Sequence, residues 1–264
     1  MLEFQDWKDF SISSWYHLFS EDTIKSIIIE IQKDLLNKLL NSNNGEESEE
    51  VECSSECLVP IQNGLNELNK SAFVRNNWRS PSDAKAFSFG NSLKVTNIED
   101  LILFFSVSDR ITRDLETDKG IPFCIVLRPW LNIHPASEFR CIVVNNILRG
   151  ITPRDWPSYY AHYKEDGPQI VNKLHNFFKS KIAHKFPRSN YIFDVICVLP
   201  DETIIVDFSP LNNKTNLLAF SWKEIHPIIK KNSKEEVSPV FRYLESDIGI
   251  MTKANAQLRF SNIV

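Results

Sequence analysis

Two apolar runs near residue 200 constrain the fold more than any other part of this chain. The first is Tyr-Ile-Phe-Asp-Val-Ile-Cys-Val-Leu (191–199), and the second is Thr-Ile-Ile-Val-Asp-Phe-Ser-Pro (203–210). The turn-forming Pro200-Asp201-Glu202 lies between them, so the pair predicts a β-hairpin. Each strand carries one carboxylate, Asp194 in the first and Asp207 in the second. Because burying a lone carboxylate is costly, each needs a cation, a hydrogen-bond donor or a metal ion.

The register of the hairpin decides whether the two carboxylates meet, because side chains alternate between faces with a period of two. If Asp194 lies opposite Asp207, the loop is even, such as Leu199–Glu202. Both carboxylates then share a face with Cβ atoms roughly 4.5–5.5 Å apart, close enough to share a divalent cation, and Ser209 joins that face. An odd loop would place Asp207 opposite Val195 instead. The alternative to a shared metal is two separate, salt-bridged aspartates.

Composition limits the kinds of function that the chain can have. Its 264 residues are 42% hydrophobic and 24% charged, with a formal net charge of −4. This length suits one large or two small domains, and the mild acidity argues against direct nucleic-acid binding. Neither G-x-G-x-x-G nor G-x-x-x-x-G-K-[ST] is present, so we expect side chains and metal to hold any phosphate group.

The N-terminus and the cysteines predict a cytoplasmic protein that does not enter a membrane. The first ten residues are acidic and lack the basic and apolar regions of a signal peptide. The longest apolar run, 121–127, is far too short to span a bilayer. Cys124, Cys141 and Cys197 lie inside apolar runs, so we expect buried, reduced thiols.

Strands and helices are mixed along the chain in a pattern typical of an α+β fold. Besides the hairpin and an isoleucine-rich strand before residue 35, we expect strands at 72–78, 121–130, 138–144 and 147–151. Helices are expected at 35–40, 59–69, 168–182 and 221–229. The run Thr96-Asn-Ile-Glu99 is a capping box that starts a further helix.

Four segments are expected from these elements. Residues 1–40 form an N-terminal strand and helix packed on the core. Residues 41–58, with six glutamates between 46 and 56, form a disordered acidic loop. Residues 59–230 form the core, with a smaller lobe at about 59–120 and a larger lobe at about 121–230, and residues 231–264 form a C-terminal tail.

Arginines embedded in strands suggest an anionic ligand. Arg75, Arg128 and Arg140 each interrupt an apolar strand, and Arg154 follows the strand that ends at 151. One buried arginine is usually paired with a carboxylate and is structural. Several of them beside a carboxylate hairpin suggest a shared phosphate ligand, because the guanidinium group binds phosphate oxygens in a bidentate way.

A nucleoside triphosphate with magnesium satisfies both sets of residues, with arginines on the phosphates and aspartates on the metal. The adenine would then pack against apolar side chains such as Leu131 and Ile205. No Ser/His/Asp or Cys/His arrangement stands out in the sequence. The residues therefore offer binding chemistry without a nucleophile or a general base, which favours a binding protein over an enzyme.

A series of short runs in a fixed order covers most of the chain, from about residue 13 to 245. These runs are Ser14-Trp-Tyr-His-Leu-Phe with Thr23-Ile-Lys-Ser, Asn77-Trp-Arg-Ser-Pro-Ser-Asp-Ala, Asn91-Ser-Leu-Lys, Ser108-Asp-Arg-Ile-Thr-Arg-Asp, Val126-Leu-Arg-Pro-Trp, Ala136-Ser-Glu-Phe-Arg-Cys, Arg154-Asp-Trp with Tyr159-Tyr160, Phe193-Asp-Val, and Val206-Asp-Phe-Ser-Pro. Together they resemble the cell division cycle 123 family of eukaryotic proteins.

The resemblance implies an ATP-grasp fold, in which ATP and magnesium are held between two α+β lobes with antiparallel sheets. It also implies a chaperone-like function: promoting assembly of the eukaryotic translation initiation factor 2 heterotrimer by binding its γ subunit. Translation initiation and cell-cycle progression would depend on this activity.

The resemblance also assigns roles to individual residues. Asp194 and Asp207 match the magnesium-binding carboxylates, and Ser209 stands where the family typically has asparagine. The basic residues that line the phosphate site are Arg128 and Arg140, together with Arg75, where the family more often has lysine. Trp130 and Leu131 match the connector that meets adenine, and Glu138 lies near the ribose.

Two other functions fit the same pattern. An ATP-grasp ligase or kinase-like enzyme would activate a carboxylate as an acyl phosphate, although a fold alone does not assign a reaction. The change to Ser209 leaves open an interaction module that binds no nucleotide. Nucleotide binding and turnover separate the three alternatives.

Overall fold

The computed structural model describes residues 4–41, 51–200, 202–231, 235, 237–246 and 260–263. The chain divides into two units by its internal contacts. Unit 1 comprises residues 1–14 and 24–131, and unit 2 comprises residues 15–23 and 132–264. Among the described residues, no helix combines the length and the apolar character needed to cross a lipid bilayer.

Unit 1 is built on a four-stranded antiparallel sheet. Its strands in spatial order are β1 (Ile27–Ile31), β4 (Phe123–Pro129), β2 (Ala72–Asn76) and β3 (Lys94–Val95). The strands expected in the isoleucine-rich run, at 72–78 and at 121–130 are thereby confirmed. However, β4 pairs with β1 and β2. It therefore belongs to unit 1, whereas the sequence suggested that the larger lobe begins near 121.

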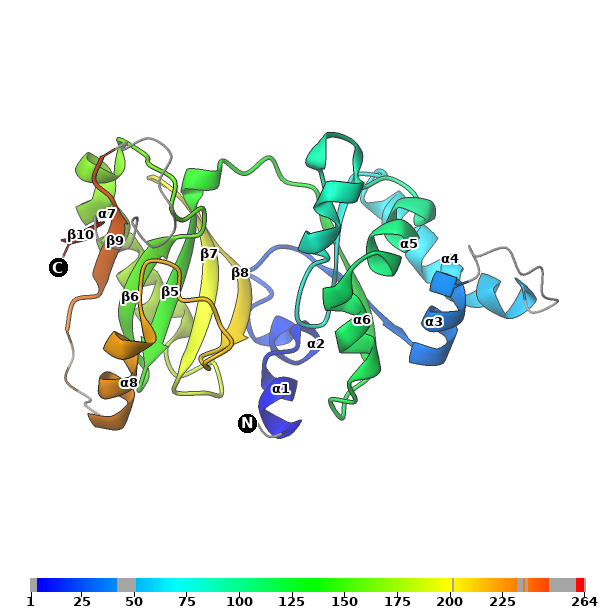
Figure 1. The fold of residues 1–264 in the computed structure, drawn as a ribbon, viewed down its shortest axis with the longest axis horizontal. Coiled ribbons are helices and arrows are strands. Elements are labelled where there is room, and N and C mark those ends of the chain that lie inside the picture. The colour runs from blue at the N-terminus through cyan, green and yellow to red at the C-terminus, as the bar shows by residue number, and fades with distance from the viewer. Residues whose placement is uncertain are drawn as a thin grey trace. The chain divides into compact units, whose positions relative to one another are not determined.

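Helices of unit 1 pack together beside this sheet (Figure 1). The helices in the first half of the chain are α1 (Phe4–Asp9), α2 (Ile12–Trp15), α3 (Lys33–Asn41), α4 (Val51–Glu67), α5 (Ile98–Ser106) and α6 (Asp109–Glu116). The capping box predicted at Thr96 is displaced by one residue. The side chain of Asn97 accepts a hydrogen bond from the backbone N–H of Asp100, and Thr96 Oγ1 donates to the Asp100 carboxylate at 2.7 Å.

Helix α4 begins at Val51, eight residues before the predicted start. Residues 51–58, expected in the acidic loop, are therefore helical, while residues 42–50 of that loop lie outside the described part of the chain. An acidic composition did not exclude a helix here, because glutamate is itself a good helix former.

Unit 2 is built on a six-stranded sheet. Its strands in spatial order are β10 (Phe260–Ile263), β9 (Val240–Leu244), β6 (Ile147–Pro153), β5 (Glu138–Val144), β7 (Tyr191–Val198) and β8 (Glu202–Pro210). Every neighbouring pair is antiparallel except β6 and β9. Asn145 and Asn146 adopt positive φ values of 55° and 61°, as expected for the tight turn between β5 and β6. The C-terminal tail contains β9 and β10, so the expectation of a simple tail after residue 231 was wrong.

Aromatic residues cover one face of the β7–β8 hairpin. Phe186 stacks on Phe208 with ring centroids 4.3 Å apart, and Phe178 stacks on Phe193 at 6.0 Å. Phe178 begins a short π-helix (Phe178–Ile182) that continues α7 (Tyr163–Phe177), so the helix predicted at 168–182 is confirmed. On the opposite face of the hairpin, Ile192 belongs to a core cluster with Ile225 of α8 (Trp222–Lys231).

A short early segment of the chain completes unit 2. Residues 15–23 lie against the β8 edge, where Thr23 Oγ1 donates to the carbonyl of Ile205 at 2.8 Å. The rings of Trp15 and Phe19 lie 5.1 and 5.0 Å from that of Phe208. Unit 2 therefore takes part of its core from residues more than a hundred positions away in sequence.

The three cysteines expected to be buried thiols are buried and free: Cys124, Cys141 and Cys197. Burial raises the pKa of Cys124 to about 11. These thiols are therefore protonated at neutral pH and unsuited to nucleophilic chemistry.

Gly150 on β6 is required by the packing of Phe220. A Cβ atom at this position would lie 2.6 Å from Phe220 Cζ, and the phenyl ring is itself buried. We expect Gly150→Ala to lower the free energy of unfolding by about 1–3 kcal/mol, because the ring must move within a packed core. Urea denaturation measures this change. Phe220→Leu in the same chain should remove part of the clash, so strictly additive losses in the double variant would contradict the explanation.

Candidate functional site

The hairpin brings the two predicted carboxylates together. Asp194 on β7 lies directly opposite Asp207 on β8, as predicted. The expected even number of loop residues was wrong, because Val198 pairs with Glu202 and three residues, 199–201, separate them. A β-bulge between Asp194 and Val195 shifts the register by one residue and restores the pairing.

Arg140 extends this row of charges onto a third strand. It lies opposite Asp194 on β5, so Arg140, Asp194 and Asp207 share one face of the sheet. The Nε and Nη2 atoms of Arg140 donate to the two carboxylate oxygens of Asp194, each at 2.8 Å. Its Nη1 atom donates to the backbone carbonyl of Asn216 at 2.6 Å. Such a bidentate pair is strong and fixes the plane of both groups.

Arg154 and Glu138 lie at the end of the same row. Arg154 Nε is 3.4 Å from a carboxylate oxygen of Asp194 and 3.4 Å from one of Glu138. Burial raises the pKa of Glu138, with the Asp194 charge adding to the rise and Arg154 opposing it. The nearby carboxylates, Asp194 first, raise the pKa of Arg154. We call these five residues, Glu138, Arg140, Arg154, Asp194 and Asp207, the charge cluster. It holds two positive charges among three carboxyl groups.

The residues of this cluster fit a magnesium ion that is bound together with phosphate. Magnesium in nucleotide sites is usually held by one or two carboxylates plus the phosphates, rather than by a full set of protein ligands. Asp207 is half-buried, and Asp194 keeps further lone pairs beyond those that accept from Arg140. Within the residues that the structure describes, no group of three or more His, Cys, Asp and Glu side chains is arranged to hold a metal alone.

Ser209, the predicted third metal residue, lies two positions beyond Asp207 on the same face and is half-buried. The neighbouring asparagines have other contacts. Asn212 Oδ1 accepts from the Lys214 N–H at 2.9 Å, and Asn213 Oδ1 lies 3.1 Å from His226 Nε2. Both asparagine side chains are therefore engaged elsewhere, and Ser209 offers only its hydroxyl group as a metal ligand.

The remaining predicted site residues belong to unit 1. Arg128 lies opposite Phe73, and Arg75 lies two residues further along β2, so both arginines share one face of the four-stranded sheet. Both are almost fully buried. Arg128 Nε donates to Ser26 Oγ at 3.0 Å, and Arg75 Nε donates to the carbonyl of Asn76 at 3.1 Å.

Trp130 and Leu131 directly follow β4, where the chain leaves unit 1. The backbone N–H of Trp130 donates to the carbonyl of Ser71 at 2.8 Å. This bond continues the pairing of β4 with β2 by one residue beyond the end of each strand. Leu131 is 38% exposed. An exposed leucine at the end of a buried strand is available for contact with an apolar ligand.

Two groups that accept hydrogen bonds from the arginines were not predicted from the sequence. The Asn216 carbonyl and the Ser26 hydroxyl both accept from a predicted phosphate-binding arginine. A backbone carbonyl leaves no signal in the sequence, and Ser26 becomes a partner only through the pairing of β1 with β4.

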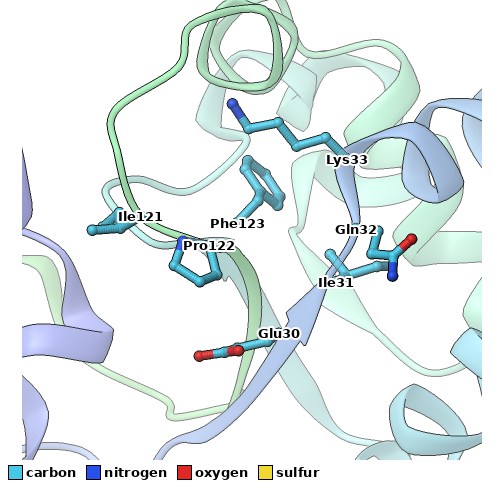
Figure 2. Close-up of a pocket in the computed structure, with 7 residues that line it drawn as sticks. All are labelled: Glu30, Ile31, Gln32, Lys33, Ile121, Pro122 and Phe123. Atoms are coloured by element: carbon cyan, nitrogen blue, oxygen red, sulfur yellow. The ribbon is translucent and has the colours of Figure 1, made fainter.

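A cavity of about 360 Å³ lies elsewhere in unit 1 (Figure 2). It is lined by the end of β1 and the beginning of β4, at Glu30, Ile31, Gln32, Lys33, Ile121, Pro122 and Phe123. None of these residues was predicted to bind a ligand, and none belongs to the charge cluster. We assign no role to this cavity.

A family model described as D123 matches residues 40–263. The chain belongs to the D123 family. This assignment confirms the family that the sequence motifs indicated. The α+β fold with two sheet-bearing units agrees with the class expected from that resemblance.

Two curated proteins and one solved structure are similar to this chain over most of their length. A translation initiation factor eIF2 assembly protein from Xenopus tropicalis is 28% identical, and the alignment covers 90% of this chain and 84% of that protein. Its counterpart in Schizosaccharomyces pombe is 30% identical, with 85% and 80% covered. The solved structure of C-terminally truncated Cdc123 from S. pombe has a TM-score of 0.76 at 28% identity, covering 90% of this chain and 98% of that one.

Proposed function

We propose that this chain is an ATP- and magnesium-binding chaperone that promotes assembly of translation initiation factor 2, acting in the cytoplasm through the γ subunit of that factor. Its D123 relatives are named as eIF2 assembly proteins. Translation initiation, and through it cell-cycle progression, would depend on this activity. The proposal includes no covalent step, because we find no nucleophile paired with a base in the charge cluster.

The observation that carries the proposal is the row formed by Arg140, Asp194 and Asp207. A structural ion pair needs only the first two residues, so Asp207 adds a second carboxylate beside an anion that is already neutralised. Like charges on paired strands repel unless a cation lies near both. Arg154 supplies part of the positive charge that is needed, and magnesium would supply the rest.

In this proposal Asp207 and Asp194 would hold magnesium, and Ser209 would be a weaker ligand of the ion. Bound by these residues, magnesium would neutralise part of the negative charge on the phosphate groups. Arg75, Arg128, Arg140 and Arg154 hold the phosphates, Trp130 and Leu131 contact the adenine, and Glu138 accepts from a ribose hydroxyl. Glutamate suits that role because it accepts hydrogen bonds when ionised.

Calorimetric titration of the full chain with ATP and magnesium tests the nucleotide site. We expect Asp207→Asn to weaken binding by at least about tenfold, the scale found when a ligand or its support is removed from a metal site. Glu202→Gln is the matched control, because Glu202 is exposed at the start of the same strand. Equal binding by wild type and Asp207→Asn would refute this site.

Capture of the isolated γ subunit, with and without ATP, tests the partner. We expect the full chain to retain the γ subunit in at least one condition. Absence of capture in both conditions would overturn the assembly function while leaving nucleotide binding to the calorimetric result. Release of ADP that depends on an added carboxylate would instead favour a ligase.

A further inference from the structure

Asn76 is a buried polar residue that immediately follows Arg75 at the end of β2. Its Nδ2 atom donates to Asp114 Oδ2 at 2.8 Å. Its Oδ1 atom accepts from the backbone N–H groups of Trp78 and Arg79, both at 2.8 Å. The backbone N–H of Asn76 also donates to the carbonyl of Arg79 at 2.9 Å. One side chain therefore closes the turn that ends the strand.

Asp114 anchors this turn to helix α6. Its carboxylate accepts from Lys119 Nζ at 2.6 Å and lies 2.9 Å from Arg79 Nε, and its side chain is 4% exposed. The Lys119 ammonium group lies over the rings of Trp78 and Trp7, 3.6 and 4.6 Å from their centroids. Burial lowers the pKa of Lys119, and the charge of Asp114 opposes that change. The Asp114 carboxylate is thus neutralised by a lysine whose ammonium group lies over two aromatic rings.

The turn also accepts a hydrogen bond from the guanidinium group of Arg75. Arg75 Nε donates to the carbonyl of Asn76, and the arginine side chain is almost fully buried. Because the guanidinium group is planar and rigid, a bond at Nε fixes the plane in which its terminal nitrogens lie. The direction of the Asn76 carbonyl depends in turn on the bonds that its own side chain makes.

The next residue offers a natural comparison. Asn77 is as fully buried as Asn76. Its Nδ2 atom donates to Ser11 Oγ and to the Pro122 carbonyl, both at 3.0 Å, and its Oδ1 atom accepts from the Cys124 N–H at 2.6 Å. Asn77 therefore has the same number of side-chain bonds as Asn76. The partners of Asn77 lie outside the turn, and Arg75 is not one of them.

We propose that Asn76 is a positioning residue for the nucleotide site, and that it acts by holding Arg75 in the orientation that grips phosphate. This inference rests on the proposed function, since Arg75 must contact the nucleotide for its orientation to matter. Asp114 connects Asn76 to helix α6 and so helps to hold the turn in place.

Titration with magnesium and ATP tests the proposal on the full chain and on paired variants. We expect Asn76→Asp to weaken ATP binding roughly tenfold, as the loss of a supporting hydrogen bond does in other preorganised sites. Asn77→Asp should lower the melting temperature by a similar amount and leave the affinity within about twofold. In an Arg75→Ala chain, Asn76→Asp should cause no further loss of affinity, because its effect passes through Arg75.

The outcomes separate the two levels of the proposal. Wild-type affinity in a folded Asn76→Asp variant, or equal further loss in the Arg75→Ala chain, would overturn the positioning role alone. Absence of ATP binding by the wild type would overturn the proposed function and this inference with it. If Asn76→Asp does not fold, Asn76→Ser removes the same donor without adding a charge and takes its place in each comparison.

Discussion

Asp194→Ala should lower the free energy of unfolding by about 3–5 kcal/mol, the usual cost of removing one partner of a buried ion pair. Arg140 would remain in the sheet with a side chain that is 8% exposed and without the carboxylate that now accepts two of its hydrogen bonds. Only the carbonyl of Asn216 would be left to it among the contacts described above. Guanidinium denaturation, with ATP absent, measures the loss.

Two further variants show whether the cost arises from the unpaired arginine. Replacing the whole pair, with Arg140→Met and Asp194→Leu, should recover most of the stability, because apolar residues of similar volume often replace a buried pair with little cost. That protein should still fail to bind ATP. Asp207→Asn should change the stability by no more than about 1 kcal/mol, because Asp207 is half-buried and loss of its charge removes repulsion with Asp194. Equal destabilisation by Asp207→Asn and Asp194→Ala would contradict the separate roles of the two carboxylates.

Asp114→Ala should have an effect of the same size, about 3–5 kcal/mol. The variant leaves Lys119, which is 5% exposed, over two tryptophan rings and without the Asp114 carboxylate at its ammonium group. It also removes the acceptor of Asn76 and an ion pair with Arg79. Thermal and urea unfolding both report the loss.

The partner variant should behave differently. Lys119→Met should cost less than Asp114→Ala, because Asp114 keeps Arg79 and Asn76 as partners. Asp109→Ala is the control on the same helix, and its exposed carboxylate should contribute no more than about 0.5 kcal/mol. If Lys119→Met were the more damaging change, the carboxylate would not be the centre of this cluster.

The charge cluster could be predicted from the sequence because isolated charges in apolar strands are costly. That argument placed Asp194 and Asp207 correctly on one face of the sheet, and the structure adds Arg140 to the same face. It reached the right register through a wrong loop length. A bulge adds one residue to β8, and no residue type in 203–210 predicts it. Register over a whole hairpin therefore depends on irregularities that alternation alone does not predict.

The errors in the fold have physical causes as well. Helix α4 extends into the glutamate-rich segment because helix propensity, rather than charge, governs whether such residues can be helical. Strand β4 was given to the wrong unit because local pattern predicts a strand but not its neighbours. β9 was missed because it joins the sheet through a parallel pairing with β6, a contact with no local signal.

The interleaving of the two units has a practical consequence for dissecting the protein. A recombinant fragment that begins at Asn132 would omit Trp15, Phe19 and Thr23, which pack and bond against β8. Its Phe208 would lose two aromatic neighbours beside the strand that carries Asp207. Deletion mapping of partner binding would then report misfolding rather than a lost contact. A circularly permuted or fused chain that supplies residues 15–23 is the appropriate unit for such work.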